Sequence, residues 1–195
     1  MILALLIFLF PLAYSPGPGN LYFAAAGARF GASGTLAASA GYHLATWGIT
    51  LMIGFGSLTI IAQAPAVFGT LKLLGGLYIL WIAWRFLKAS HTGVTTTASS
   101  ARFSDGVMLL LLNPKAYVII ALMFTQFLPP SDRENAGLVI LITTVFTLNN
   151  LLAFTVWTLV GDQLATVFSS PGQARLLNKG FALMLFGVAI WILLA

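Results

Sequence analysis

The chain has 195 residues, and only 9 Lys or Arg and 4 Asp or Glu among them carry charge. Charged residues make up 7% of the sequence and hydrophobic residues 59%. A soluble domain usually carries about a quarter charged residues, so this composition excludes a soluble enzyme, a nucleic-acid-binding domain and a disordered chain. The net charge of +5 is spread thinly and forms no basic patch. Cysteine is absent, which excludes disulfides, thiolate metal sites and thiol redox chemistry.

The sequence predicts an all-α polytopic membrane protein with six transmembrane helices. A span needs about 20 mostly apolar residues, and such segments cover residues 2–30, 35–62, 66–87, 104–128, 137–161 and 176–195. The chain therefore divides into a three-helix half at 1–88, a polar loop rich in Ser and Thr at 89–103, and a second three-helix half at 104–195. The first segment carries no charge at its start and lacks the basic region of a signal peptide, so it is interpreted as a retained span.

The placement of Lys and Arg predicts the orientation. Lys72 and Arg133 fall on one side of the membrane, and a larger group falls on the side of the 89–103 loop, namely Arg29, Arg85, Lys88, Arg102, Arg175 and Lys179. The positive-inside rule places that loop in the cytoplasm and both termini in the periplasm. Three spans in each half make the halves inverted repeats, as in many transporters. The repeat is inferred from this pattern alone, because the halves share no strong sequence identity.

Two spans are predicted to be interrupted. The first contains Pro16-Gly17-Pro18-Gly19-Asn20, which is incompatible with a regular helix, and the fourth contains Asn113-Pro114-Lys115. Each interruption lies 8 or 9 residues from the cytoplasmic edge of its span, which is about 12–14 Å at the rise of an α-helix. Both therefore fall near the membrane midplane. Paired Gly/Pro interruptions in corresponding spans point to a transporter's binding site.

The chemistry of the interruptions favours an anion. Asn113 followed by Pro114 is the pattern of an N-cap and a first helical residue, and a new helix N-terminus carries partial positive charge. Lys115 adds a full charge within the membrane, so this end is suited to a carboxylate. The alternative is a proline kink that only shapes the bundle. The expected substrate-binding residues are Pro16, Gly17, Pro18, Asn20, Asn113, Pro114, Lys115 and Asn150.

Asn150 belongs to a polar stripe on the fifth span that also includes Thr143, Thr147 and Thr158. Such a stripe can line a pathway, or its threonines can bond to their own helix while the Asn packs between helices. Two residues are candidates for proton coupling. His43 lies about 12 Å into the second span and can relay protons, or it can be a neutral His bonded between helices. Asp162 lies at the cytoplasmic end of the fifth span, where an interfacial role is favoured over a coupling role.

Several motifs together resemble the LysE/RhtB family of bacterial amino-acid exporters. The Pro-Gly-Pro-x-Asn element of its first span matches Pro16 to Asn20, and its third-span pattern matches Leu71 to Tyr78. Its fourth-span elements match Phe103 with Gly106, Leu112 to Ala116, and Gln126-Phe127. The resemblance implies a transporter of the bacterial inner membrane that exports amino acids or related small metabolites by antiport with protons. Members often carry an Asp in the fifth span before a Trp, whereas this chain has Asn149 and Asn150 before Trp157.

Other functional classes find less support in the sequence. Neither an H-E-x-x-H zinc motif nor a G-x-S-x-G elbow is present, so no enzyme activity, metal or cofactor is expected. A passive channel or a non-transporting membrane subunit is the alternative, because no carboxylate lies deep in a predicted span. The expected partners are a small amino-acid-like substrate, protons and the lipid bilayer, with a homo-oligomer as an open possibility and no nucleic acid.

Overall fold

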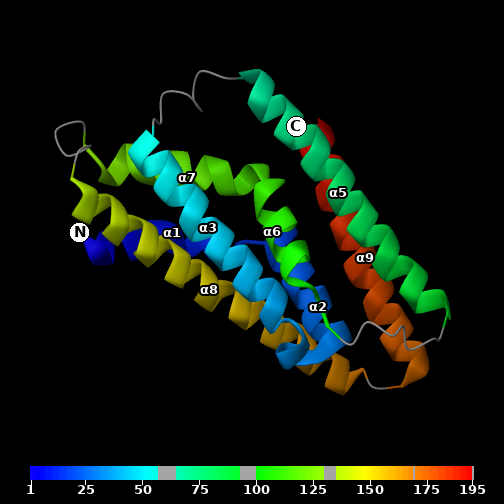
Figure 1. Ribbon diagram of the computed structural model, residues 1–195. Helices are drawn as coiled ribbons and strands as arrows, with labels where there is room; N and C mark the ends of the chain where they lie inside the picture. Colours follow the sequence, from blue (N-terminus) through cyan, green and yellow to red (C-terminus); the bar gives the residue numbers. More distant parts are fainter. Residues whose placement is uncertain (57–64, 93–99, 130–134, 169, 195) are drawn as a thin grey trace.

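The computed structural model describes residues 1–56, 65–92, 100–129, 135–168 and 170–194. All regular secondary structure in these ranges is helical, as the composition predicts (Figure 1). The helices are α1 (Ile2–Tyr14), α2 (Pro18–Gly34), α3 (Leu36–Gly56), α5 (Pro65–Thr92), α6 (Phe103–Leu111), α7 (Pro114–Phe127), α8 (Ala136–Val167) and α9 (Pro171–Leu194).

Local sequence signals set several helix ends. α6 begins at a capping arrangement in which the Asp105 carboxylate accepts a hydrogen bond from Arg102 N at 3.1 Å, and α8 begins where the Asn135 side chain accepts one from Leu138 N at 3.1 Å. Gly31 lies between the first two predicted spans, has a φ of +74° and kinks the last turn of α2. That conformation is strained for residues with a Cβ. Between the predicted fourth and fifth spans, residues 130–134 lie outside the described residues.

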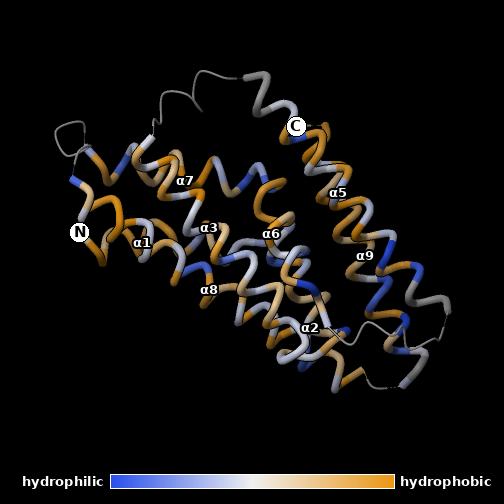
Figure 2. Tube along the Cα trace, viewed as in Figure 1, coloured by the Kyte–Doolittle hydropathy of each residue, from blue (hydrophilic) through white to orange (hydrophobic). Residues whose placement is uncertain are grey.

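Three described helical stretches are long and apolar enough to cross a membrane: Gly69–Lys88 in α5, all of α8, and Gly172–Leu194 in α9. Two further pairs qualify as bent spans. α1 with α2 and α6 with α7 are each bent by 63° at a short break, so both predicted interruptions are confirmed. The number of spans is therefore three by single helices and up to five with the bent pairs. Figure 2 shows hydrophobic residues along the length of these helices.

The helices are held in close pairs, of which α2 with α8, α5 with α9 and α3 with α6 are the most extensive. Where α2 crosses α8, a glycine of each helix lies against the backbone of the other. A side chain at Gly27 would meet the carbonyl of Thr158, and one at Gly161 would meet the carbonyl of Ala24. The two backbones are therefore in direct contact, the arrangement that small residues permit between membrane helices.

Glycines also allow close contact between the backbones of α3 and α6. A side chain at Gly41 would collide with the carbonyl of Phe103, and one at Gly106 would collide with the carbonyl of Ala38. Within the two bent spans, α2 and α6 are thus each fixed to a long neighbouring helix. The other parts of these spans, α1 and α7, pack instead through large side chains, among them Leu5, Leu9, Ile120, Met123 and Phe124.

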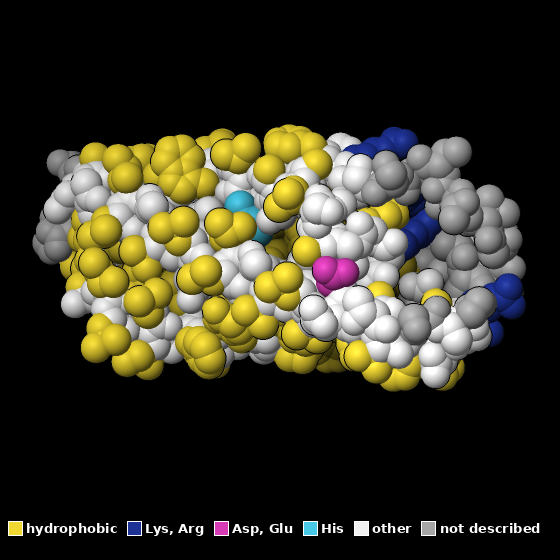
Figure 3. All heavy atoms as spheres, turned by 90° about the horizontal axis from the view of Figure 1, so that it is seen from below, with side chains coloured by type: hydrophobic (Ala, Val, Ile, Leu, Met, Phe, Trp, Pro, Cys, Tyr) yellow, Lys and Arg dark blue, Asp and Glu magenta, His cyan; other side chains and the backbone are white. Residues whose placement is uncertain are grey.

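The outer surface is apolar over most of its area and charged at one end. Figure 3 shows hydrophobic side chains covering the larger part of one face, with the visible Lys and Arg side chains gathered at one end. Arg85 lies over the Trp81 ring at 4.7 Å and Lys88 over the Trp84 ring at 5.3 Å. Exposed apolar surface of this extent is stable only in contact with lipid or a partner, so the distribution is that of a multi-pass membrane protein.

Candidate functional site

The two interruptions meet in the middle of the molecule. Lys115, in the first turn of α7, donates hydrogen bonds from Nζ to Ser15 Oγ at 2.9 Å and to Ser15 O at 3.1 Å. Ser15 follows the last residue of α1, so the contact joins residues 100 positions apart in the chain. The sequence predicted both breaks, and the structure adds that a charged side chain of one is bonded to the backbone of the other.

The second break forms as its sequence predicts. Asn113 is the N-cap of α7, and its side-chain oxygen accepts a hydrogen bond from Lys115 N at 3.2 Å. Pro114 occupies the first helical position, where no backbone donor is needed. The Asn113 amide nitrogen also donates to Tyr42 Oη at 3.3 Å, which ties the break to α3. The positive end of α7 and the Lys115 ammonium are therefore held side by side.

The first break exposes three successive backbone carbonyls at the end of α1. The side chain of Asn20, on α2, donates to Ala13 O at 2.8 Å. Trp157, on α8, donates from Nε1 to Tyr14 O at 3.2 Å, and Lys115 donates to Ser15 O. Carbonyls freed by a break in a membrane helix must find donors nearby, and here three different helices supply them.

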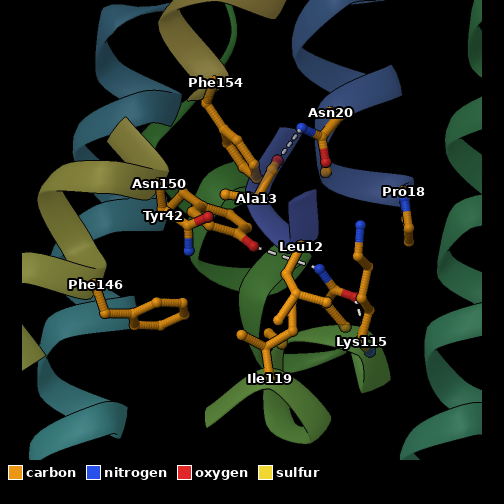
Figure 4. Close-up of a pocket in the computed structure, with 13 residues that line it drawn as sticks. Leu12, Ala13, Pro18, Asn20, Tyr42, Lys115, Ile119, Phe146, Asn150 and Phe154 are labelled. Carbon is orange, nitrogen blue, oxygen red and sulfur yellow. Dashed lines mark hydrogen bonds between the residues drawn. The ribbon is translucent and has the colours of Figure 1, made fainter. Parts of the chain in front are cut away.

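A small cavity lies where these elements converge. Its volume is about 20 Å³, which is room for about one water molecule. Figure 4 shows Phe146, Asn150 and Phe154 reaching from α8 toward Tyr42, with Asn20 and Lys115 on the other side. The polar groups that could orient a small zwitterion are gathered here, but the cavity is too small to hold one. A substrate can enter only if the surrounding side chains move.

A second, larger cleft of about 510 Å³ lies on the other side of Lys115. It runs between the two breaks and α9, and its wall includes Ser15, Lys72 and Trp191. Pro18 and Lys115 line both the small cavity and this cleft. Its volume is in the range of small-molecule sites in proteins.

All eight residues expected to bind substrate lie at one of these two cavities. Pro18, Asn20, Asn113, Lys115 and Asn150 line the small one. The cleft is lined by Pro16, Gly17, Pro18, Pro114 and Lys115. The sequence thus predicted residues that the fold brings together, although they lie on three different helices and in the two short segments at the breaks.

The two candidates for proton coupling lie elsewhere. His43, on α3, donates from Nδ1 to Ser39 O at 2.7 Å, and its ring packs against those of Tyr42 and Phe154 at 5.3 Å and 5.5 Å. It is therefore one layer behind the small cavity. Asp162 accepts a hydrogen bond from Ala32 N at 3.4 Å, close to the turn between α2 and α3 and remote from both cavities.

Among the residues of the site that sequence reasoning missed are Ser15, Tyr42, Lys72 and Phe154. Ser15 directly precedes the Pro-Gly-Pro element, and nothing in its local sequence marks it as a partner of Lys115. Tyr42 and Phe154 are aromatic residues of the kind that fill any helical core. No sequence pattern distinguishes an aromatic residue that lines a cavity from one that packs in the core. Lys72 was assigned to a membrane edge, but its position inside an apolar segment is a sequence signal for a functional lysine.

A multi-pass helical bundle with a small-molecule cleft at two broken helices belongs, by fold and site, to the class of membrane transport proteins. The comparisons with known proteins agree with this class. The model of the LysE type translocator family matches residues 10–195, and the chain belongs to this family. The resemblance seen in the motifs is therefore confirmed.

Three proteins are similar in sequence to this chain over most of its length. The homoserine/homoserine lactone efflux protein of Salmonella typhimurium is 28% identical over 87% of this chain and 84% of its own length. The leucine efflux protein of an Enterobacter species is 22% identical over 88% of this chain and 84% of its own length. An uncharacterized membrane protein of Vibrio cholerae is 29% identical over 95% of this chain and 92% of its own length. No solved structure matches the chain.

Proposed function

We propose that this protein exports amino acids or related small metabolites across the bacterial inner membrane. The observation that carries the proposal is the contact of Lys115 with Ser15, because it places a cation at the N-terminus of α7 and at the first break together. Relatives named as efflux proteins for homoserine, homoserine lactone and leucine support the same substrate class. The carboxylate that homoserine and leucine both carry suits this end of α7.

The bound substrate takes the place of Ser15 as the partner of Lys115. Its carboxylate then accepts from the Lys115 ammonium and from the positive end of α7. The amide oxygens of Asn20 and Asn150 and the Tyr42 hydroxyl line the same small cavity and are acceptors for the substrate's ammonium group. Since Lys115 holds the first break closed in the empty protein, loss of that contact couples binding to a change in the break.

The proposed topology has six spans in two inverted halves. α3 is the span that composition alone does not select, and its 21 residues are enough to cross the membrane. With α3 included, each half contains one bent span and two further spans. The positive-inside rule then places the predicted 89–103 loop in the cytoplasm and both termini in the periplasm. Transport proceeds by rocking of the halves about the breaks.

We further propose that His43 carries the coupling proton. Its Nδ1 is bonded to Ser39 O, so Nε2 is the nitrogen that can accept a proton. This Nε2 atom is buried and has no hydrogen-bond partner among the described residues, and the same holds for the hydroxyls of Thr50 on α3 and Thr143 on α8. Unpaired polar atoms in a membrane interior are costly, which supports water between these two helices. Asp162 is the weaker candidate, because it already accepts from a backbone amide.

Efflux from substrate-loaded vesicles tests the assignment. Lys115→Ala and Asn113→Ala are expected to abolish most of the transport that the wild type shows, because both remove groups that hold the carboxylate. Lys88→Ala is the matched control, since Lys88 is exposed and contacts only the Trp84 ring in the described structure. Wild-type rates in both site variants would refute the site.

The same vesicles separate an exporter driven by protons from a passive channel. Transport by the wild type against a concentration gradient is expected to stop when the proton gradient is collapsed. His43→Gln is expected to retain downhill flux but to lose the response to the proton gradient. Efflux that continues unchanged after the collapse supports the channel instead.

A further inference from the structure

The larger cleft contains a second cation that the sequence placed at the membrane edge. Lys72, on α5, lines the same cleft of about 510 Å³ as Lys115, on α7. The two lysines come from helices in different halves of the chain. A pair of cations that converge on one apolar cleft is costly in a membrane and therefore calls for a ligand that compensates them.

The position of Gly75 explains why Lys72 faces the cleft. A side chain on Gly75 would collide with the carbonyl of Leu112 and lie 3.4 Å from the ring of Pro114, so α5 touches the second break at this glycine. Lys72 precedes Gly75 by three positions and so lies on the same face of α5, about 4.5 Å along the helix axis. Lys72 is thus placed beside the break and not at the edge of the bundle.

Apart from Ser15 and the two lysines, the cleft wall is apolar. α9 contributes Val188, Trp191 and Ile192, and α7 contributes Val118 and Leu122. No acidic side chain is among the described residues that line the cleft. A cationic group bound here would meet two like charges and no carboxylate, whereas an apolar group would be buried against α7 and α9.

We propose that this cleft is a binding site for carboxylates with an apolar side chain, held between Lys72 and Lys115. The inference rests on the proposed function and adds its substrate class: neutral amino acids with apolar side chains and their N-blocked derivatives are bound, while cationic amino acids are rejected. The shared chemistry is an anionic group joined to an apolar tail, which an anionic lipid also offers. The test separates the two sources.

Equilibrium binding to the purified full chain, in nanodiscs of zwitterionic lipid, tests the proposal with four probes. Leucine and N-acetylleucine, which both carry a carboxylate, are expected to bind and to compete with each other. Leucinamide, which lacks the carboxylate, and lysine, which carries a second cation, are expected to bind at least about tenfold more weakly. Lys72→Gln is expected to weaken N-acetylleucine binding about tenfold, the loss of one charge-assisted hydrogen bond. Lys72→Arg is expected to retain it.

Lys88→Gln is the matched control, because it makes the same change on the same helix at an exposed position. Wild-type affinity for N-acetylleucine in the folded Lys72→Gln protein overturns the proposal. So does an outcome in which Lys72→Gln loses binding of an anionic lipid but keeps that of N-acetylleucine, since the lipid is then the occupant. Absence of amino-acid efflux from wild-type vesicles refutes the exporter function separately, because binding of N-acetylleucine is measured without transport.

Discussion

The two breaks are bent by the same 63° but are stabilised in different ways. The second is stabilised largely by its own segment: Asn113 caps α7, and Tyr117 donates from Oη to Leu111 O at 3.0 Å. The first has no side-chain cap of this kind at the start of α2, and two of its three freed carbonyls are bonded by Trp157 and Lys115 from other helices.

The difference indicates which break responds to a ligand. A break that is capped within its own segment keeps its shape when distant contacts change. A break held by donors from elsewhere changes when one donor is taken away, and a substrate carboxylate competes with Ser15 for Lys115. We infer that the first break is the moving part and the second is the fixed platform.

The largest effect is expected from Gly75→Ala, which disturbs the close contact between α5 and the second break. The added methyl group would meet the Leu112 carbonyl, and relief of this collision should cost about 3 kcal/mol of stability. Thermal unfolding in detergent measures it. Gly69→Ala, on the same helix with nothing within 4 Å, is the control and should not lower the melting temperature. Equal melting temperatures for the two variants would contradict the packing of α5 on this break.

Asn20→Ala removes the donor that the first break receives from its own span. Because Ala13 O is then left without its 2.8 Å hydrogen bond, a loss of about 2 kcal/mol is expected. Asn178→Ala, on α9, provides the comparison, since the Asn178 side chain makes no hydrogen bond within the described structure and is only half-buried. The same unfolding assay applies, and an effect no larger than that of Asn178→Ala would show that the break does not depend on this bond.

Trp157→Phe keeps the ring and removes the donor to Tyr14 O. The expected loss is about 1 kcal/mol, the usual contribution of one neutral hydrogen bond. Cysteine substituted for Ser15 reports on the break directly, because the chain has no other cysteine. Its labelling by a small polar thiol reagent should rise in the Trp157→Phe background. In a Trp84→Phe background it should not, because Trp84 is 51% exposed and remote from this carbonyl. Unchanged labelling in both backgrounds would refute the role of Trp157.

The smallest effect is expected from Tyr117→Phe, which removes a local donor of the second break. Tyr117 is half-buried, so the Leu111 carbonyl can find another partner, and we expect a loss of about 0.5 kcal/mol. Export rates should stay at the wild-type level. Tyr14→Phe serves as the control, since the Tyr14 hydroxyl has no hydrogen bond in the described structure and the ring stacks on Phe10 at 4.6 Å. A loss of export in Tyr117→Phe alone would reverse the assignment of fixed and moving breaks.

Much of the fold could be predicted because the information is local. The low charge content indicated that the protein lies in a membrane. Two breaks in the spans were predicted at Pro16, Pro18 and Pro114, since proline removes a backbone donor wherever it stands. Asn113 before Pro114 predicted the start of α7. The motifs around these residues also indicated the family.

The partners of the site could not be predicted, because they depend on how the bent helices cross. Nothing local pairs Lys115 with Ser15 or Trp157 with the Tyr14 carbonyl, residues 100 and 143 positions apart. The position of Lys72 could not be predicted for the same reason. Its charge is visible in the sequence, but it lines the cleft only because α5 contacts the second break at Gly75. The sequence by itself determined a membrane protein with two broken spans and one buried cation. The tertiary structure decided what that cation touches and placed a second beside it, because backbone breaks are set by neighbouring residues, whereas side-chain partners are set by helix packing.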